Sequence, residues 1–227
     1  MPVNKEVYQQ ITEELKKEKV TLVAVSKIKP VSDILELYQA GQKDFGENYV
    51  QELVEKQAQL PQDIHWHFIG HLQSNKVKSI APFIHLIQGV DSFKLLKEIN
   101  KQAEKCKRVI ECLLQVYIAQ EETKFGFDEE ELDDLLSIHS KALEELKNIK
   151  VTGLMGMASF SDDMNKVRNE FRSLKKIFDK YSQLSTNNFH LSALSMGMSG
   201  DYKVAVEEGS TMVRIGSLLF GERNYQK

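Results

Sequence analysis

Short apolar segments alternate with amphipathic segments along nearly the whole chain, and this alternation constrains the fold more than any other feature. Eight segments rich in β-branched and aromatic residues predict strands, and a helical pattern follows each of them. The predicted strands cover residues 20–26, a brief segment before Phe45, and residues 64–69, 84–87, 109–118, 151–155, 189–191 and 211–215. Eight such units in about 200 residues match a closed (β/α)8 TIM barrel of parallel strands joined by right-handed crossovers. A doubly wound open sheet is the alternative.

Amphipathic or capped segments predict the helices. Val7, Ile11 and Leu15 form one narrow apolar stripe in residues 4–18, so residues 1–19 are expected to be an additional helix packed outside the barrel. Further helices are expected from Ser32 to Tyr38 before Gly41, through Leu53 and Ala58, after Leu72, and over residues 91–105, 128–147, 164–184, 201–207 and 218–223. No long linker interrupts the pattern, and residues 1–227 are therefore expected to form a single domain.

The charge balance and the apolar segments argue against several classes of partner. The formal net charge is −3, so we expect neither nucleic acid nor an anionic membrane surface as partner. No apolar run approaches the roughly 20 residues that span a bilayer, and the start Met1–Glu6 lacks the apolar core of a signal peptide. We therefore expect a cytoplasmic protein, in which Cys106 and Cys112 serve as packing residues.

Lys27 stands at the carboxyl end of the first predicted strand, Leu22–Ser26, which carries no charge. Alternation places its side chain on the face of Val23 and Val25, which can strip water from its stem. A partly desolvated lysine has a lowered pKa, and its neutral amine can attack a carbonyl to form a Schiff base. The alternative is an ordinary solvated lysine in a loop.

Barrel closure brings the carboxyl ends of all strands to one mouth, where the active sites of such barrels lie. The polar residues expected there are Lys27, Glu47, Asn48, His71, Asn75, Lys124, Ser195–Ser199 and Arg214–Ser217. Glu47 and Asn48 are equally compatible with helix capping. Residues 119–127 are polar and are a candidate for a moving loop.

Two glycine-containing turns follow the last two predicted strands, Leu194–Gly200 and Val213–Ser217. Backbone N–H groups and the Ser199 hydroxyl can bind an anion there, and these loops are a frequent phosphate site in (β/α)8 barrels. The alternative is that the glycines serve tight turns alone. Arg214 lies within the apolar strand and needs a partner, either a ligand in the mouth or one of the carboxylates of Glu207, Glu208 and Glu222.

His65 and His67 are two residues apart, on one face of a predicted strand around Trp66. No third histidine or carboxylate stands nearby in the sequence. We therefore expect a structural pair and no metal site.

The motifs as a set resemble the pyridoxal phosphate homeostasis protein family over residues 20–223. The segments that carry the resemblance are Val23–Lys27 with Lys29–Pro30, Phe45–Tyr49, Trp66–Gly70 with Leu72, Gln73, Asn75 and Lys76, Leu194–Ser199 with Asp201, and Val213–Gly216 with Phe220–Gly221. The resemblance implies a barrel like the N-terminal domain of alanine racemase. It also implies that the protein binds pyridoxal 5′-phosphate without known enzymatic turnover. It also implies Lys27 as the Schiff-base lysine, Arg214 facing the pyridine nitrogen, Ser199, Gly216 and Ser217 around the phosphate, and Asn48 and Met196 beside the ring.

The same resemblance favours a carrier over an enzyme. Alanine racemase-like enzymes take a second base from a C-terminal domain, and no such domain is expected here. An arginine opposite the ring nitrogen also leaves the ring a weak electron sink. We expect a monomer that takes part in vitamin B6 homeostasis and releases the cofactor to apo-enzymes. The alternatives are a weak pyridoxal-dependent racemase or lyase and a cofactor-free Schiff-base aldolase.

Overall fold

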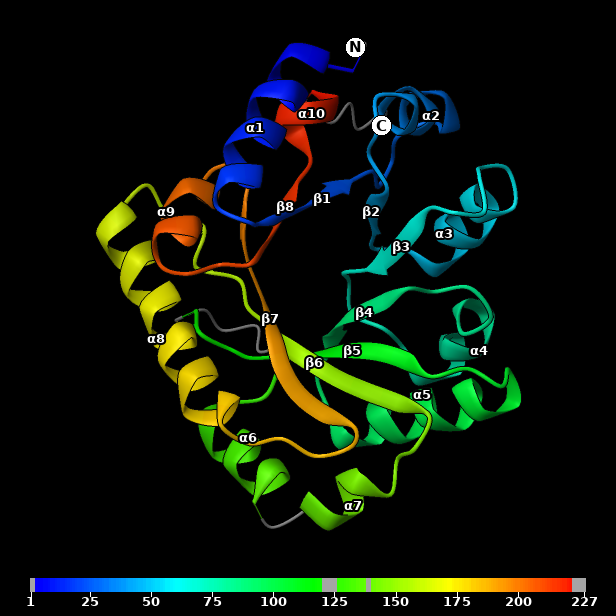
Figure 1. The fold of residues 1–227 in the computed structure, drawn as a ribbon, viewed down its shortest axis with the longest axis vertical. Coiled ribbons are helices and arrows are strands. Elements are labelled where there is room, and N and C mark those ends of the chain that lie inside the picture. The colour runs from blue at the N-terminus through cyan, green and yellow to red at the C-terminus, as the bar shows by residue number, and fades with distance from the viewer. Residues whose placement is uncertain (1–2, 120–125, 138–139, 222–227) are drawn as a thin grey trace.

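A closed barrel of eight parallel strands forms the centre of the molecule (Figure 1). The computed structural model describes residues 3–119, 126–137 and 140–221. The strands are β1 (Thr21–Val25), β2 (Asp44–Glu47), β3 (His65–Phe68), β4 (Leu86–Val90), β5 (Ile110–Gln115), β6 (Ile149–Met155), β7 (Phe189–Met198) and β8 (Met212–Ile215). Each strand pairs with the next, and β1 pairs with β8 to close the barrel. The predicted TIM barrel is confirmed, and the open sheet is wrong.

Helices surround the strands in chain order (Figure 1). They are α1 (Lys5–Lys17), α2 (Val31–Gln39), α3 (Val50–Gln57), the 3₁₀ turn η1 (Ser74–Lys76), α4 (Val77–Ile80), α5 (Phe93–Lys105), α6 (Glu129–Leu136), α7 (Ser140–Glu144), α8 (Met164–Ser182), α9 (Tyr202–Glu207) and α10 (Ser217–Phe220). Of the stripe predicted on α1, Ile11 and Leu15 are buried, whereas Val7 is only partly buried and Tyr8 completes the inward face. The Asn4 N–H donates to the carbonyl of Leu219 at 2.9 Å, which ties the start of this helix to α10 outside the barrel.

Two predicted elements differ most from the structure, while β4 and β5 differ from their predicted bounds by one to three residues. The helix expected over residues 128–147 is divided into α6 and α7. The Ser137 hydroxyl donates to the carbonyl of Asp133, and the Ser140 hydroxyl donates to the carbonyl of Ser137, an alternative to continued helical bonding. The seventh strand was expected to stop at residue 191, yet β7 continues to Met198. Four of its later residues, Ser192, Ala193, Ser195 and Gly197, are small or polar and have low strand propensity, but pairing with β6 and β8 on both sides overrides it.

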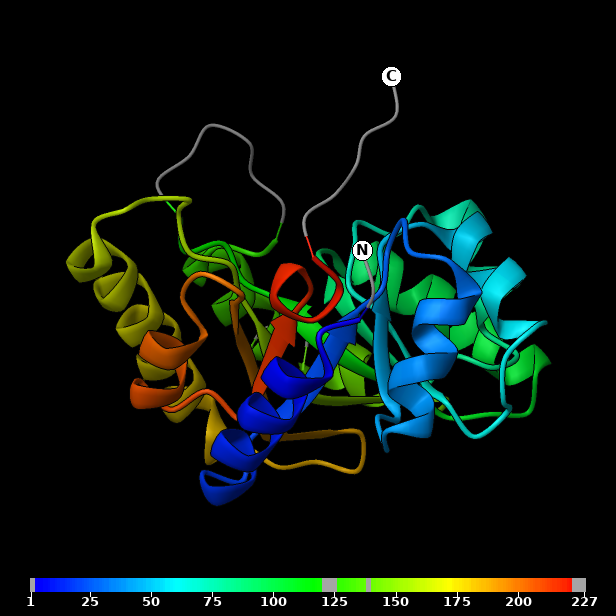
Figure 2. The same cartoon turned by 90° about the horizontal axis from the view of Figure 1, so that it is seen from above.

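The apolar core has two parts because strand side chains alternate in direction. The larger part fills the space between strands and helices and includes Cys112, with Cys106 packed against it. The smaller part lies inside the barrel and consists of Val23, Leu86, Leu113, Met155 and Met212. Above it, the carboxyl ends of the strands open toward the end of the molecule where α10, in red, lies (Figure 2). Among the described residues, no helix has the length and apolar character needed to cross a bilayer.

Candidate functional site

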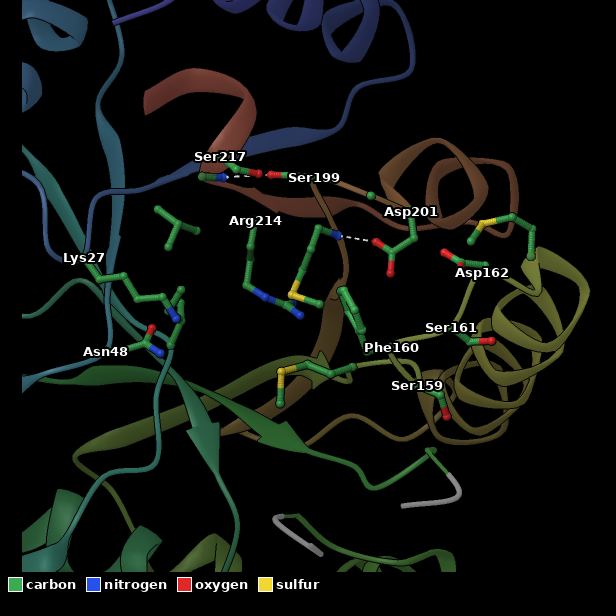
Figure 3. Close-up of a pocket in the computed structure, with 17 residues that line it drawn as sticks. Lys27, Asn48, Ser159, Phe160, Ser161, Asp162, Ser199, Asp201, Arg214 and Ser217 are labelled. Atoms are coloured by element: carbon green, nitrogen blue, oxygen red, sulfur yellow. Dashed lines mark hydrogen bonds between the residues drawn. The ribbon is translucent and has the colours of Figure 1, made fainter. Parts of the chain in front are cut away.

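A cavity of about 550 Å³ lies at the carboxyl ends of the strands (Figure 3), within the size range of pockets for small molecules. Its lining comes from segments far apart in the chain. The lining residues are Val25, Lys27, Asn48, Ile69, Met157, Ser159–Asp162, Met164, Met198–Asp201, Arg214, Gly216 and Ser217. The structure therefore brings together six of the seven predicted site residues, all except Met196.

Lys27 is half-buried and is held through its two neighbours in the chain. The carbonyl of Ser26 accepts a hydrogen bond of 2.7 Å from Lys56 Nζ on α3, and the N–H of Ile28 donates to Glu52 Oε1 at 2.6 Å. Ile28 has a φ of 63°, which is rare for a β-branched residue and costs on the order of 1–3 kcal/mol. The contacts from α3 thus hold a strained turn that directs Lys27 into the cavity (Figure 3).

Glu47 lies behind this turn and is fully buried. It accepts hydrogen bonds from the Ser26 hydroxyl at 2.6 Å and from Lys56 Nζ at 2.8 Å. Burial raises the pKa of Glu47 to about 7, even though Lys56 and the Ser26 hydroxyl favour its charged form. Glu47 neither lines the cavity nor caps α3, whose N-cap is Tyr49. Its contacts with Ser26 and Lys56 support the backbone that precedes Lys27.

Asn48 faces the cavity beside Lys27 (Figure 3). Its Oδ1 atom is buried and has no hydrogen-bond partner among the described residues. A buried polar atom without a partner costs free energy, and such atoms are rare in folded proteins. An amide oxygen that faces a cavity in this state is suited to a ligand donor.

Polar groups of two loops meet on the opposite side of the cavity. The Ser199 hydroxyl accepts a hydrogen bond of 3.2 Å from the N–H of Gly216, which joins the loop after β7 to the loop after β8. Asp201 Oδ1 accepts from the N–H of Met198 at 2.5 Å and closes the first loop. Because α9 has six residues and α10 only four, the hydroxyls and backbone N–H groups, and not long helix dipoles, offer this side of the cavity to an anion.

Arg214 is almost fully buried in β8 and points into the cavity (Figure 3). Its Nη1 donates to Ser195 Oγ at 2.7 Å and its Nη2 to the carbonyl of Gly156 at 3.0 Å. Burial lowers the pKa of Arg214 to about 10, while Asp201 favours the charged form. The side chain therefore remains cationic at neutral pH.

The carboxylates expected as alternative partners of Arg214 do not serve it. Glu207 and Glu208 pair instead with Arg168, at 2.5 and 2.6 Å, and Glu208 also pairs with Arg172 at 2.8 Å. Glu222 lies outside the described residues. The hydrogen-bond partners of Arg214 in the described part of the chain are thus a hydroxyl and a carbonyl, and neither of them carries a charge.

Met196 was expected beside the ligand, but the structure places it elsewhere. It is fully buried in the outer core cluster, between the strands and the helices. Because Leu194–Met198 belongs to β7, side chains alternate there: Ser195 points into the barrel and Met196 away from it. A register shift follows between Ser195 and Met198, and Met198 lines the cavity instead.

Sequence reasoning also missed the loop after β6. Met157, Ser159, Phe160, Ser161 and Asp162 line the cavity, and Phe160 is fully exposed at its rim. Their position just after the sixth predicted strand was a usable signal. Of the other residues expected at the mouth, His71 and Asn75 do not line the cavity, and His71 pairs with Asp91 at 2.7 Å. Lys124 and most of the 119–127 segment lie outside the described residues.

Comparison with known proteins agrees with this barrel and cavity. The family model described as alanine racemase, N-terminal domain, matches residues 5–224. An alanine racemase of Clostridium difficile 630 has the same fold, with a TM-score of 0.74 at 14% identity over 99% of this chain and 59% of its own. The fold and the family match thus define a barrel of the alanine racemase N-terminal domain type.

Nearer relatives narrow this class. A pyridoxal phosphate homeostasis protein of Haemophilus influenzae is 42% identical over 91% of this chain and 86% of its own length. One from Aquifex aeolicus is 43% identical over 90% and 87%. PipY of Synechococcus elongatus, in a structure with PLP bound, has a TM-score of 0.82 at 33% identity over 95% of this chain and 100% of its own. The chain belongs to the pyridoxal phosphate homeostasis protein family.

Proposed function

We propose that this protein binds pyridoxal 5′-phosphate in the cavity at the barrel mouth and serves the homeostasis of that cofactor in the cytoplasm, as a carrier or regulator. The observation that carries the proposal is the joint placement in one cavity of a lysine, a cationic arginine, an amide oxygen with no partner among the described residues, and two hydroxyl-bearing loops. The PLP-bound relative and the names of the curated relatives support it.

Each group of the cofactor has a matching side chain in the cavity. Ser199, Gly216 and Ser217 hold the phosphate, and Asn48 lies beside the ring with Met198 in the place expected for Met196. Arg214 faces the pyridine nitrogen. Pyridoxal phosphate supplies an aldehyde, which condenses with a neutral primary amine with loss of water. Lys27 is the amine in this proposal, and its strained, tethered turn directs it toward that aldehyde.

Arg214 also explains why binding without turnover is favoured. A cationic guanidinium disfavours a second positive charge on the ring nitrogen, and only a protonated ring strongly withdraws electrons from the substrate carbon. Among the described residues, the hydrogen-bond partners of the Arg214 guanidinium are a hydroxyl and a carbonyl, and no carboxylate is among them. The protein therefore holds the reactive aldehyde as a Schiff base on Lys27, away from free amines, and releases it to apo-enzymes.

Spectroscopy of the Lys27→Ala variant tests the attachment. The purified wild-type chain, incubated with pyridoxal phosphate, should acquire the visible absorbance of a protein-bound imine, and borohydride should fix the cofactor to the peptide that contains Lys27. Lys27→Ala should lack the band and the fixed adduct. Lys76→Ala is the control, because this exposed lysine lies outside the cavity and should leave both unchanged. A band that survives in Lys27→Ala, or is lost in Lys76→Ala, would place the attachment elsewhere.

Isotope exchange tests the lack of turnover. The loaded protein is incubated in heavy water with single enantiomers of amino acids, and deuterium at the α-carbon is followed by NMR. A carrier should give no exchange above that of free pyridoxal phosphate. Exchange at enzyme-like rates would instead establish a racemase or lyase. A chain that stays colourless with the cofactor but reacts with phosphosugars would be an aldolase.

A further inference from the structure

Three histidines and one aspartate meet at the end of the barrel opposite the Lys27 cavity. Asp44 begins β2, His65 begins β3, and His85 immediately precedes β4. Parallel strands bring these amino-terminal ends to one face, and His67, two residues into β3, joins the group from inside the barrel. The sequence spacing indicates only the pair of His65 and His67. Asp44 and His85 join the pair through the pairing of β3 with β2 and β4, which the spacing does not show.

The donor atoms of three of these residues lie close together. One atom each from Asp44, His67 and His85 lies within 4.8 Å of the other two. The closest pair is His67 Nε2 and Asp44 Oδ1, at 3.0 Å. In a tetrahedral zinc site with metal bonds of about 2.1 Å, two donor atoms are about 3.4 Å apart, so small side-chain shifts suffice to close this group around an ion.

We propose that Asp44, His67 and His85 form a binding site for a divalent transition-metal ion of the zinc class at the amino-terminal end of the barrel. Two imidazole nitrogens and one carboxylate oxygen are a donor set that suits such ions. His67 is buried, Asp44 is about one-quarter exposed and His85 is exposed, so the ion can enter from solvent and keep at least one position open for water.

The surroundings hold two of the rings in place. The ring of His65 stacks on that of His85 with centroids 4.5 Å apart, and His65 Nδ1 lies 3.2 Å from Asp44 Oδ1. Gln88 Nε2 lies 3.0 Å from His67 Nδ1. A metal-binding histidine usually donates the N–H of its second nitrogen to a neighbouring group, and Gln88 is the group that lies at this nitrogen of His67. His65 and Gln88 are therefore positioning residues for the site.

Metal binding requires one local rearrangement, which involves the ring proton of His67 and the side-chain amide of Gln88. His67 now directs Nε2 toward Asp44 and receives Gln88 Nε2 at Nδ1. An ion on Nε2 moves the single ring proton of His67 to Nδ1, and the amide of Gln88 must then turn its oxygen toward that proton. Gln88→Met removes this acceptor while keeping the volume of the side chain, and it should weaken metal binding by about 10- to 100-fold.

Equilibrium dialysis of the full chain without a histidine tag against Zn²⁺ tests the proposal. We expect one ion per chain and a rise in the melting temperature with Zn²⁺, because the ion binds the folded chain. His85→Gln should lose at least tenfold in affinity and should still fold, since His85 is exposed. His71→Gln is the matched control: His71 is also an exposed histidine paired with an aspartate, but it belongs to no group of three possible metal ligands among the described residues.

Two outcomes would overturn the site: less than one bound ion per chain, or equal affinities of His85→Gln and the wild type. An equal loss in His71→Gln would likewise show non-specific surface binding. His65→Gln separates the roles further, because a positioning residue should cost less affinity than a ligand. The measurement uses the metal alone and needs no pyridoxal phosphate, so its result is independent of the function proposed for the Lys27 cavity.

Discussion

Arg214 Nη1 donates a hydrogen bond of 2.7 Å to Ser195 Oγ inside the barrel. Ser195 Oγ donates in turn to Gln88 Oε1 at 2.7 Å, and the Gln88 amide nitrogen contacts His67 Nδ1. A continuous chain of hydrogen bonds thus runs through the buried interior, from the cavity at one end of the barrel to the histidine group at the other. Because every member is buried, the loss of one link leaves polar groups without partners.

Ser195→Ala should destabilise the fold and disturb the cavity together. The change removes an acceptor from the buried guanidinium of Arg214, and a hydrogen bond to a charged group contributes about 1.5–3 kcal/mol. We expect the free energy of unfolding, measured by urea denaturation, to fall by about that amount. Ser192→Ala is the control on the same strand, because Ser192 is exposed and should change stability by under about 0.5 kcal/mol. Equal stability of the two variants would contradict the role assigned to Ser195.

Asn48→Ala should weaken cofactor binding while leaving the free protein as stable as the wild type. Asn48 Oδ1 has no partner in the described part of the chain, so its removal breaks no hydrogen bond of the fold at that atom. One hydrogen bond to the ligand contributes about 1 kcal/mol, which corresponds to a roughly fivefold rise in the dissociation constant of pyridoxal phosphate. Titration by absorbance and urea denaturation of the same preparations measure the two effects. A loss of stability without a change in affinity would contradict the contact.

Lys56→Met should be strongly destabilising. The change leaves Glu47 buried without its ion-pair partner, and breaking such a pair costs about 3–5 kcal/mol. It also removes the donor to the carbonyl of Ser26, so the attachment of cofactor to Lys27 should decrease as well. Lys175→Met is the control, because the pair of Lys175 with Asp179 is largely exposed and should contribute under about 1 kcal/mol. Similar losses in the two variants would refute the assignment.

The stability of the wild-type protein should fall as the pH rises through neutrality. The pKa of Glu47 is about 7 in the folded state and has its ordinary value of 4.5 when unfolded, so the folded state retains a proton that the unfolded state releases. This contribution is complete below about pH 4.5 and is lost as the pH rises through 7, amounting to up to about 3 kcal/mol. Urea denaturation from pH 5 to pH 8 measures it. Glu47→Gln should remove this part of the slope, and an unchanged slope would assign it to other groups.

Gly197→Ala should disrupt the end of β7, just before Ser199. Gly197 has a φ of 96°, and an added Cβ would lie 2.6 Å from the Cβ of Ala205. Strain and collision together should lower the free energy of unfolding by at least about 1–3 kcal/mol and weaken phosphate binding. Gly200→Ala is the matched control, because an added Cβ there meets no atom within 4 Å. The affinity for inorganic phosphate and the melting temperature should both fall in Gly197→Ala and should both stay unchanged in Gly200→Ala.

The sequence by itself determined the barrel and much of the cavity. Apolar strands such as Leu22–Val25 alternate with amphipathic helices such as α1, and this local periodicity sets both the element types and their parallel order. Residues that directly follow predicted strands, such as Lys27 and Ser217, were placed correctly because barrel closure converts that position into a location at the mouth.

Only the tertiary structure decided the features that depend on pairing between strands. The length of β7 comes from its two neighbours and not from its own propensity, and that length turned Met196 away from the cavity and Ser195 into the barrel. The ion pair of Glu47 with Lys56 and the meeting of Asp44 with His85 join separate elements. Hydrogen bonds and ion pairs act over a few ångströms in space, and residues far apart in the sequence come within that distance only when the barrel closes.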